Sequence, residues 1–395
     1  MRVIDDTLGR DRLRFYYAET NEDIRWIRQR FVRYRSWGMD TESTGLNTYQ
    51  PGWQLRTFQF GRSNVSYVIP AKFKHAIERF ILTSKFWIGH NGPHDIRSID
   101  CHLGYETGVV CQGETYIPAH HSDPRNRMEG GIGHGLKEQA IALVSRDAGK
   151  WEEALKAEFK NILVPIEGEV FKSGPRKGQP KTRKARLAEG WGLIDPRNDA
   201  YIAYAASDPI ITFRLWKRYR SVVRGSANLY AFDHRVQIAC DQLQRRAIRL
   251  DTAYTNRLNA AFVRMAQRYS ERAKAYGCQN IFSGQQIVDT LTGMGVQLRD
   301  RTATGKFQAD NRVLRDVAAR HANTDVSDFI NCVLVAKQLL KRKESYTSAF
   351  LSEMDMHGRV HPSINSLAAR TARMSVSRPA LQQLPTKDRG NDLEE

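Results

Sequence analysis

The chain has 395 residues, a length that predicts two or three domains with enough residues to bury a core in each. Hydrophobic residues make up 41% of the chain, which excludes a wholly disordered protein. The 61 Lys and Arg residues outnumber the 43 Asp and Glu residues, and the formal charge of +18 favours a polyanionic partner. Nucleic acid is the usual partner of this kind, and a basic surface without a partner is the alternative.

Cysteine usage and hydropathy indicate where the protein works. The cysteines are odd in number and form no CxxC pair, so they indicate neither a zinc ribbon nor a disulfide framework. The first residues are too charged for a signal peptide, and no stretch approaches the roughly 18 apolar residues of a membrane span. We therefore expect a cytoplasmic protein without a membrane partner.

The first half of the chain alternates predicted strands and helices. We expect a helix at 21–34, strands at 36–42, 54–61 and 65–70, a helix at 71–82, a buried strand at 86–91, and helices that begin near 93, 133, 151 and 195. Pro209 should bend the last of these helices. This alternation predicts a sheet covered by helices, an α/β fold.

A basic stretch lies between Phe171 and Leu187. It contains seven Lys and Arg residues, no acid, and several Gly and Pro residues, so it predicts a loop or an extended hairpin. Three of its residues are candidates for contact with a phosphate backbone: Lys181, Arg183 and Lys184. A solvated loop is the alternative.

From about residue 225 the chain is predicted to be nearly all helical. The expected helices lie at 230–246, 251–276, 284–294, 310–321 and 326–354, and short strands follow around a Gly-containing turn. A change from basic to small residues near 222–228 predicts a boundary between domains at 1–224 and 225–395.

Three segments place carboxylates where a metal site could form: WGMDTES, IGHNGPHDI and YAASDPIIT. Asp40 and Glu42 are two residues apart on a predicted strand, so both side chains leave the same face of the sheet. Tyr204 and Asp208 are four residues apart on a predicted helix and share one face. Together with Asp95, these acids would make an all-oxygen site for two Mg²⁺ or Mn²⁺ ions, which suits in-line displacement at phosphorus. For each acid alone, a helix cap or a surface charge is the alternative.

The same segments resemble the motifs of a nuclease family. WGMDTESTGL is similar to the first motif, GHNGPHDIRSI to the second and YAASD to the third motif of the DEDDy 3′–5′ exonucleases, which include the proofreading domain of family A DNA polymerases. The second half contains NIFSGQQIVDTLTGMGVQL, TATGKFQADNRVLRDVA, VLVAKQLLKRKESYTSAF and HPSINSLAARTARMSVSRPALQQLP, which resemble the thumb and palm-entry segments in unbroken order. The chain therefore resembles a phage-type, DNA polymerase I-like enzyme from about Arg35 to Pro385.

This resemblance implies a ribonuclease H-like exonuclease domain, with a mixed sheet flanked by helices, followed by a mainly α-helical thumb-like domain. It implies that Asp40, Glu42 and Asp208 bind one metal ion, and that Asp40 and Asp95 hold a second. The Tyr204 hydroxyl would orient the attacking water together with Glu42. A half-buried packing tyrosine is the alternative for Tyr204.

The resemblance also implies contacts with DNA. Leu46 would lie against the terminal base, or be an ordinary core residue, and Asn91 would orient its turn or touch the substrate. Arg373 falls on the arginine that reads the primer minor groove in the family, next to Ala372 in place of a glycine. Basic residues of the second half would grip duplex phosphates, with a solvated helix face as the alternative: Arg245, Arg246, Lys306, Lys337, Lys341, Arg342 and Lys343.

Only ten residues follow Pro385, so we expect the catalytic palm and the fingers of the family to be missing from this chain. The expected function is a 3′–5′ exonuclease of DNA replication or repair, without a complete polymerase site. The alternative is a non-catalytic protein that binds primer-template DNA, or a subunit of a split polymerase whose palm and fingers lie on a separate chain. A ribonuclease of the ribonuclease D kind shares the motifs, but the thumb-like second half argues against it.

Overall fold

The structure is a computed structural model that describes residues 1–299, 301, 305 and 307–384. The chain divides into two compact units: residues 1–246 with 363–376, and residues 247–362 with the described residues from 377 onward. The first unit extends past the boundary predicted at 224/225, because helix α10 (Ala227–Arg246) packs on other elements of that unit. These units are defined by contacts alone, so the predicted division into domains at 1–224 and 225–395 stays a prediction.

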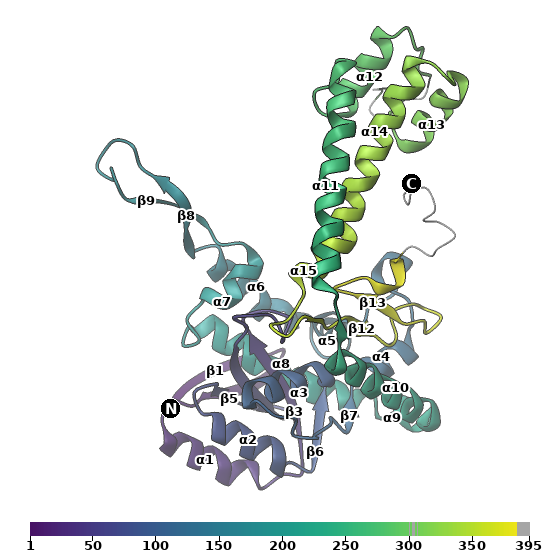
Figure 1. Cartoon of the computed structure of the whole chain (residues 1–395). Helices are drawn as coiled ribbons and strands as arrows, with labels where there is room; N and C mark the ends of the chain where they lie inside the picture. Colours follow the sequence, from purple (N-terminus) through teal and green to yellow (C-terminus); the bar gives the residue numbers. More distant parts are fainter. Residues whose placement is uncertain (300, 302–304, 306, 385–395) are drawn as a thin grey trace. The chain divides into compact units, whose positions relative to one another are not determined.

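The first unit is built on a seven-stranded mixed sheet flanked by helices, which confirms the predicted α/β architecture (Figure 1). In sheet order, the strands are β1 (Arg2–Leu8), β2 (Asp11–Tyr17), β5 (Val65–Pro70), β4 (Leu55–Gly61), β3 (Ser36–Ser43), β6 (Phe86–Gly89) and β7 (Gly113–Glu114). Strand β3 pairs antiparallel with β4 and parallel with β6. The strand that carries Asp40 and Glu42 is therefore an interior strand of the sheet.

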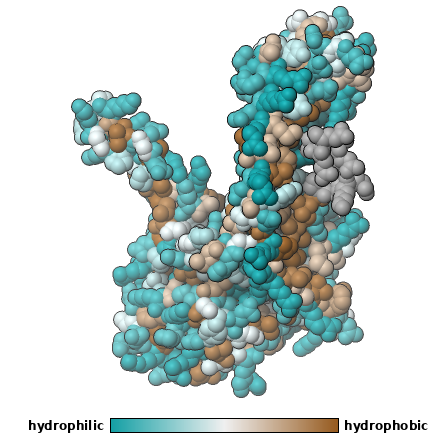
Figure 2. Space-filling view, viewed as in Figure 1, coloured by the Kyte–Doolittle hydropathy of each residue, from teal (hydrophilic) through white to brown (hydrophobic). Residues whose placement is uncertain are grey.

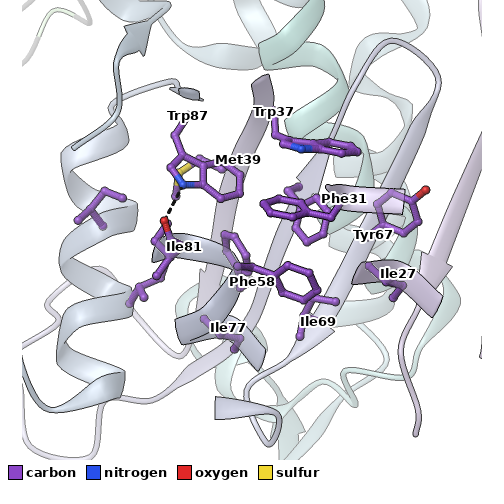
Figure 3. Packing of buried hydrophobic residues seen from close by; sticks show 14 of the residues in the cluster. Ile27, Phe31, Trp37, Met39, Phe58, Tyr67, Ile69, Ile77, Ile81 and Trp87 are labelled. Atoms are coloured by element: carbon purple, nitrogen blue, oxygen red, sulfur yellow. Dashed lines mark hydrogen bonds between the residues drawn. The ribbon is translucent and has the colours of Figure 1, made fainter. Parts of the chain in front are cut away.

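One face of the sheet packs against three helices: α1 (Asn21–Phe31), α2 (Lys74–Thr83) and α3 (Gly92–Leu103). Trp37 and Met39 of β3 are fully buried in this core, where the rings of Phe31 and Trp37 stack with their centroids 5.5 Å apart (Figure 3). Successive side chains of a strand point to opposite faces. Trp37 and Met39 therefore fill this core, and Asp40 and Glu42 point to the other face.

Helix α8 (Asp199–Arg218) covers that other face and packs across β3, β4 and β5. The Asn198 side chain caps the start of α8 by accepting hydrogen bonds from the backbone N–H groups of residues 200 and 201. Pro209 lies inside α8, which continues for nine residues beyond it to Arg218, and the bend predicted there stays a prediction. Other helices of the first unit are α4 (Tyr116–Ser122), α5 (Leu136–Leu143), α6 (Lys150–Phe159), α7 (Leu187–Leu193) and α9 (Arg220–Gly225).

The hairpin β1–β2 is an element that the sequence prediction lacks. Its first strand is mostly polar, and its burial alternates without a fully apolar face. In β2, by contrast, Leu13, Phe15 and Tyr17 are buried and alternate with exposed or half-buried residues. This period of two, next to Gly9 in a left-handed turn, is the signal that identifies the hairpin.

Of the two predicted forms, a loop or an extended hairpin, the structure has the hairpin: β8 (Leu163–Val170) lies just before the basic stretch, which forms the connection and β9 (Pro180–Lys184), paired antiparallel with β8. The hairpin projects from the first unit next to α6 and α7 (Figure 1). Its outer part carries mostly hydrophilic residues around a small apolar spot (Figure 2). The hairpin thus exposes Lys172, Lys177 and Lys184 to solvent, whereas Lys181 and Arg183 are half-buried.

The second unit is mainly helical, as predicted. Its helices are α11 (Thr252–Ala275), α12 (Gly284–Gly293), α13 (Asn311–Arg320), α14 (Asp325–Arg342) and α15 (Ala349–Ser352), with a π-helical turn at Lys343–Ser348 that interrupts the long helix expected at 326–354. Helix α11 packs along α14. Its short strands are β10 (Ile248–Arg249) and β11 (Arg359–Val360), whereas β12 (Ser363–Asn365) belongs to the first unit and β13 (Ser375–Ser377) begins there. Within the described part of the chain, no helix combines the length and apolar character needed to cross a membrane.

Candidate metal centre

Strand β3 and helix α8 bring three carboxylates together. Asp40 and Glu42 leave the face of β3 on which α8 packs, and Asp208 lies on α8. One oxygen from each of these carboxylates lies within 4.8 Å of the other two. These are the predicted acids that the structure gathers into one cluster.

Asp95 is tied to the same strand from the other side. It lies in the first turn of α3, and the Thr41 hydroxyl donates a hydrogen bond of 2.7 Å to its Oδ1 atom. Thr41 is the residue between Asp40 and Glu42, so the Asp95 carboxylate is held beside the end of β3. The pKa of Asp95 is raised to about 7, chiefly because the side chain is buried.

Burial and mutual repulsion disfavour the charged forms of the cluster. The pKa of Asp40 is raised well above its usual range by burial and by the carboxylates of Asp95, Glu42 and Asp208, in that order. Burial also raises the pKa of Glu42, and the charge of Asp208 adds to it. Gln59 on β4 donates a hydrogen bond of 2.7 Å to Asp40. Such a site favours protons or a bound cation.

A lysine that the sequence prediction missed faces the cluster. The Lys137 ammonium, from the first turn of α5, forms an ion pair with Asp208. It also donates to the Ser207 hydroxyl at 3.4 Å. Its segment, GHGLKEQAIALVS, predicts a helix but carries no sign that this residue reaches α8.

A second missed residue is Glu114 at the end of the sheet. Its carboxylate accepts hydrogen bonds of 2.8 Å from the backbone N–H groups of Asn91 and Gly92 and one of 2.9 Å from that of Tyr116. Asn91 adopts a left-handed backbone with φ 66° just before α3. Glu114 therefore fixes the turn from which α3 delivers Asp95, and an isolated Glu in a short strand carries no pattern that would reveal this role.

Buried ion pairs also hold α3 in place. The Arg97 guanidinium pairs with Asp241 of α10, and Arg245 of α10 pairs with Asp100 of α3 at 2.7 Å. Arg245 also bonds Asp241 at 2.6 Å. The expectation that Arg245 faces duplex phosphates is wrong, because its side chain is enclosed by these acids.

Tyr204 lies one helical turn before Asp208. Its ring packs against Trp191 with the ring centroids 5.5 Å apart, and the Lys137 ammonium lies 4.6 Å from the centroid of its ring. Burial raises the pKa of Tyr204 well above its usual value, and the carboxylates of Asp208 and Glu42 add to the rise. The hydroxyl is therefore protonated at neutral pH and available as a hydrogen-bond donor.

Known proteins that resemble this chain are DNA polymerases. The DNA polymerase family A model matches residues 252–393. The DNA polymerase of Mycobacterium phage L5 is 28% identical over 381 residues, which are 94% of this chain and 60% of that protein. The chain is therefore similar to family A DNA polymerases.

Two further similarities cover part or most of the chain. DNA polymerase I of Chloroflexus aurantiacus is 29% identical over 196 residues, which are 47% of this chain and 20% of that protein. A solved structure titled "POL domain of Pol1 from M. smegmatis complex with DNA primer-template and dNTP" matches with a TM-score of 0.60 and 13% identity, over 94% of this chain and 56% of that chain. This likeness shows the fold. The chain spans about three fifths of the length of the phage polymerases that it matches.

The residues expected to contact DNA lie in several places. Leu46 is 65% exposed after β3, and the Asn91 side chain is exposed at the start of α3. Arg373 is exposed, and the preceding Ala372 has φ 55°, the left-handed region that suits the glycine of the polymerase signature. Lys306 lies outside the described residues.

The three basic residues predicted in the hairpin differ in their surroundings. Lys181 pairs with Glu169 at 3.1 Å, and Arg183 makes two hydrogen bonds of 2.7 Å to Glu189. The side chain of Lys184 is exposed and has no polar partner among the described residues. Two of the three are therefore already paired within the protein.

Proposed function

We propose that this chain is a metal-dependent 3′–5′ exonuclease of the proofreading type that acts on the single-stranded 3′ end of DNA in replication or repair. The observation that carries the proposal is the convergence of Asp40, Glu42 and Asp208 in one small cluster. The similarity to family A DNA polymerases supports DNA as the substrate. The cytoplasm stays the expected location.

The residues present fit two Mg²⁺ or Mn²⁺ ions, because these hard cations prefer carboxylate oxygens. Asp40, Glu42 and Asp208 would hold one ion. Asp40 would be shared with the second ion, which Asp95 would hold directly or through water. When bound, such ions lower the pKa of an attacking water and stabilise the leaving 3′ oxygen.

The remaining tasks fall to side chains around the acids. The protonated Tyr204 hydroxyl and the Glu42 carboxylate would orient the water for attack on the terminal phosphodiester. Glu114 and Thr41 keep Asp95 at the end of β3. Leu46, exposed near the site, would lie against the terminal base.

The test is release of mononucleotides from a single strand labelled at its 3′ end. Release should require Mg²⁺ or Mn²⁺ and be lost in Asp40→Ala and in Asp208→Asn. Asp40→Ala should stay folded because it relieves repulsion from the neighbouring acids. Asp199→Asn is the matched control, because Asp199 lies on the same helix, exposed and paired with Arg2. Metal-dependent release that persists in Asp40→Ala, or loss of folding in that variant, would contradict the proposal.

We also propose that the hairpin β8–β9 contacts the phosphate backbone. Lys172 and Lys177 at its tip and Lys184 on β9 are exposed, and within the described chain their side chains make no hydrogen bond or ion pair. Lys181 and Arg183 remain candidates, although contact with DNA would require exchange of their acidic partners. Binding of this kind is independent of sequence and weakened by salt.

A second candidate function is non-catalytic binding of primer-template DNA, alone or with a separate chain that carries palm and fingers. The match of the polymerase family to residues 252–393 favours it. So does a groove of about 740 Å³ in the second unit, lined by Arg315, Lys337, Lys341 and Arg342 among others. Wild-type protein that binds primer-template DNA but releases no nucleotide with either metal would support this candidate over the exonuclease.

A further inference from the structure

Lys137 is the lysine that the fold inserts into the carboxylate cluster. Its ammonium forms an ion pair with Asp208, and only 14% of its side chain is exposed. The Ser207 hydroxyl lies 3.4 Å from the ammonium. It donates a hydrogen bond of 3.1 Å to Asp208. Tyr204 presents its ring 4.6 Å away. The ammonium thus lies between two residues that the proposed function places in the reaction.

The positive charge of Lys137 acts on Glu42 as well as on Asp208, its ion-pair partner. It opposes the rise in the pKa of Asp208, and it also opposes the rise in the pKa of Glu42. In the absence of metal, the ammonium therefore does part of what a divalent ion would do for these acids. A cation that binds Asp208 must compete with it.

The charges explain what the ammonium could do once metal is bound. The four carboxylates Asp40, Glu42, Asp95 and Asp208 balance two divalent ions, so the charge of Lys137 is left without a partner. A phosphodiester brings one negative charge, and more charge develops on its oxygens during attack. The lysine ammonium sits on a flexible four-carbon stem, so it can turn from Asp208 to a nearby oxygen.

We propose that Lys137 is a catalytic residue that binds a non-bridging oxygen of the scissile phosphodiester, and that it pairs with Asp208 while the metal site is empty. The proposal rests on the proposed exonuclease function. In the reaction, a P–O bond forms from water and the P–O3′ bond breaks, which releases a nucleoside 5′-monophosphate. One proton of the water ends on the leaving 3′ oxygen, and Lys137 keeps its own protons throughout.

The test compares Lys137→Met with wild type in two measurements. Without DNA, calorimetric titration with Mn²⁺ should show tighter binding to the variant, by about three- to tenfold, because the competing cation is gone. With a 3′-labelled strand at saturating Mn²⁺, kcat should fall by about 10²-fold, the size of effect found when one group that stabilises the charged transition state is removed. Lys137→Arg keeps the charge and should retain more of the rate.

Lys150→Met is the control, because Lys150 pairs with Asp6 at 2.7 Å outside the cluster, at a more exposed position than Lys137. It should change neither the Mn²⁺ affinity nor kcat. A kcat of Lys137→Met within about twofold of wild type would overturn the catalytic role and leave a structural ion pair. An Mn²⁺ affinity of Lys137→Met equal to that of wild type would show that Lys137 does not compete with the metal ion for Asp208. If the wild-type protein releases no nucleotide, the proposed exonuclease function is wrong, and the phosphate contact of Lys137 is wrong with it. This outcome is seen with wild type alone, before any variant is made.

Discussion

Gly38 of β3 lies directly against the backbone carbonyl of Pro209 in α8. A Cβ atom built at Gly38 would overlap that oxygen and come within 3.2 Å of the Phe213 backbone nitrogen. The close approach therefore requires a residue without a side chain. It seats α8 on the same face of β3 that carries Asp40, and so brings Asp208, the residue before Pro209, to the cluster.

Gly38→Ala should damage both the fold and the metal centre. The added methyl group must push α8 away from β3, and overpacking of this kind costs about 1–3 kcal/mol or more. We expect a lower free energy of unfolding in denaturant titration and weaker Mn²⁺ binding, because Asp208 moves with α8. Gly225→Ala is the control, since a Cβ there meets no atom within 4 Å. Equal Mn²⁺ affinity in Gly38→Ala and wild type would show that the contact does not position the acid.

Without metal, the free energy of unfolding of the wild-type protein should fall as pH rises, compared with that of the Asp95→Asn variant. The pKa of Asp95 is about 7 in the folded protein but about 4 in an unfolded chain. Below pH 4 the acid is protonated in both states, and between pH 4 and 7 it ionises only on unfolding, so its stabilising contribution is lost over that window. In EDTA, Asp95→Asn should therefore unfold at a higher temperature than wild type at pH 8, and the gap should close toward pH 4. A gap that is constant with pH would contradict the buried, repelled state of Asp95.

Tyr204→Phe separates the two interpretations of this tyrosine. If the hydroxyl orients the water, kcat should fall by about 10²-fold, within the range of groups that act on the attacking nucleophile. The unfolding temperature should change little, because the packing of the ring on Trp191 is kept. A variant with wild-type kcat would leave Tyr204 as a packing residue.

The hairpin prediction can be tested through the salt dependence of DNA binding. Each phosphate contact on a single strand contributes about 0.7 to the slope of log affinity against log salt concentration. Loss of both tip lysines in the double variant Lys172→Ala, Lys177→Ala should therefore reduce the slope by about 1.4. Lys181→Ala is the comparison, and it should have a smaller effect because Lys181 is paired with Glu169. An unchanged slope in the double variant would indicate a solvated hairpin.

Local patterns predicted most of the elements that carry the site. The alternation in β3 places Asp40 and Glu42 on one face, and helical spacing places Tyr204 and Asp208 on one turn of α8. What these patterns could not give is which parts of the chain meet in space. The sequence around Lys137 does not indicate that its helix packs on α8, or that the Lys137 ammonium reaches Asp208.

Long-range contacts also explain the other differences. Glu114 acts through backbone groups of a turn distant in sequence, so its role depends on the pairing of β6 with β7. Arg245 has the composition of a phosphate-binding residue, but packing of α10 on α3 encloses it beside Asp100. The hairpin β1–β2 was not predicted from the sequence, because its strands contain many charged residues and few apolar residues in alternation.

We propose that the cluster of Asp40, Glu42 and Asp208 removes nucleotides from DNA 3′ ends. The most direct measurement follows a single strand labelled at its 5′ end, with either a free or a chemically blocked 3′ end, in the presence of Mn²⁺. We predict a ladder of labelled products shortened one nucleotide at a time, seen only with the free 3′ end and absent in Asp208→Asn. Cleavage of the blocked strand, or an intact free strand after incubation with folded, Mn²⁺-loaded wild type, would show that the cluster does not remove nucleotides from 3′ ends.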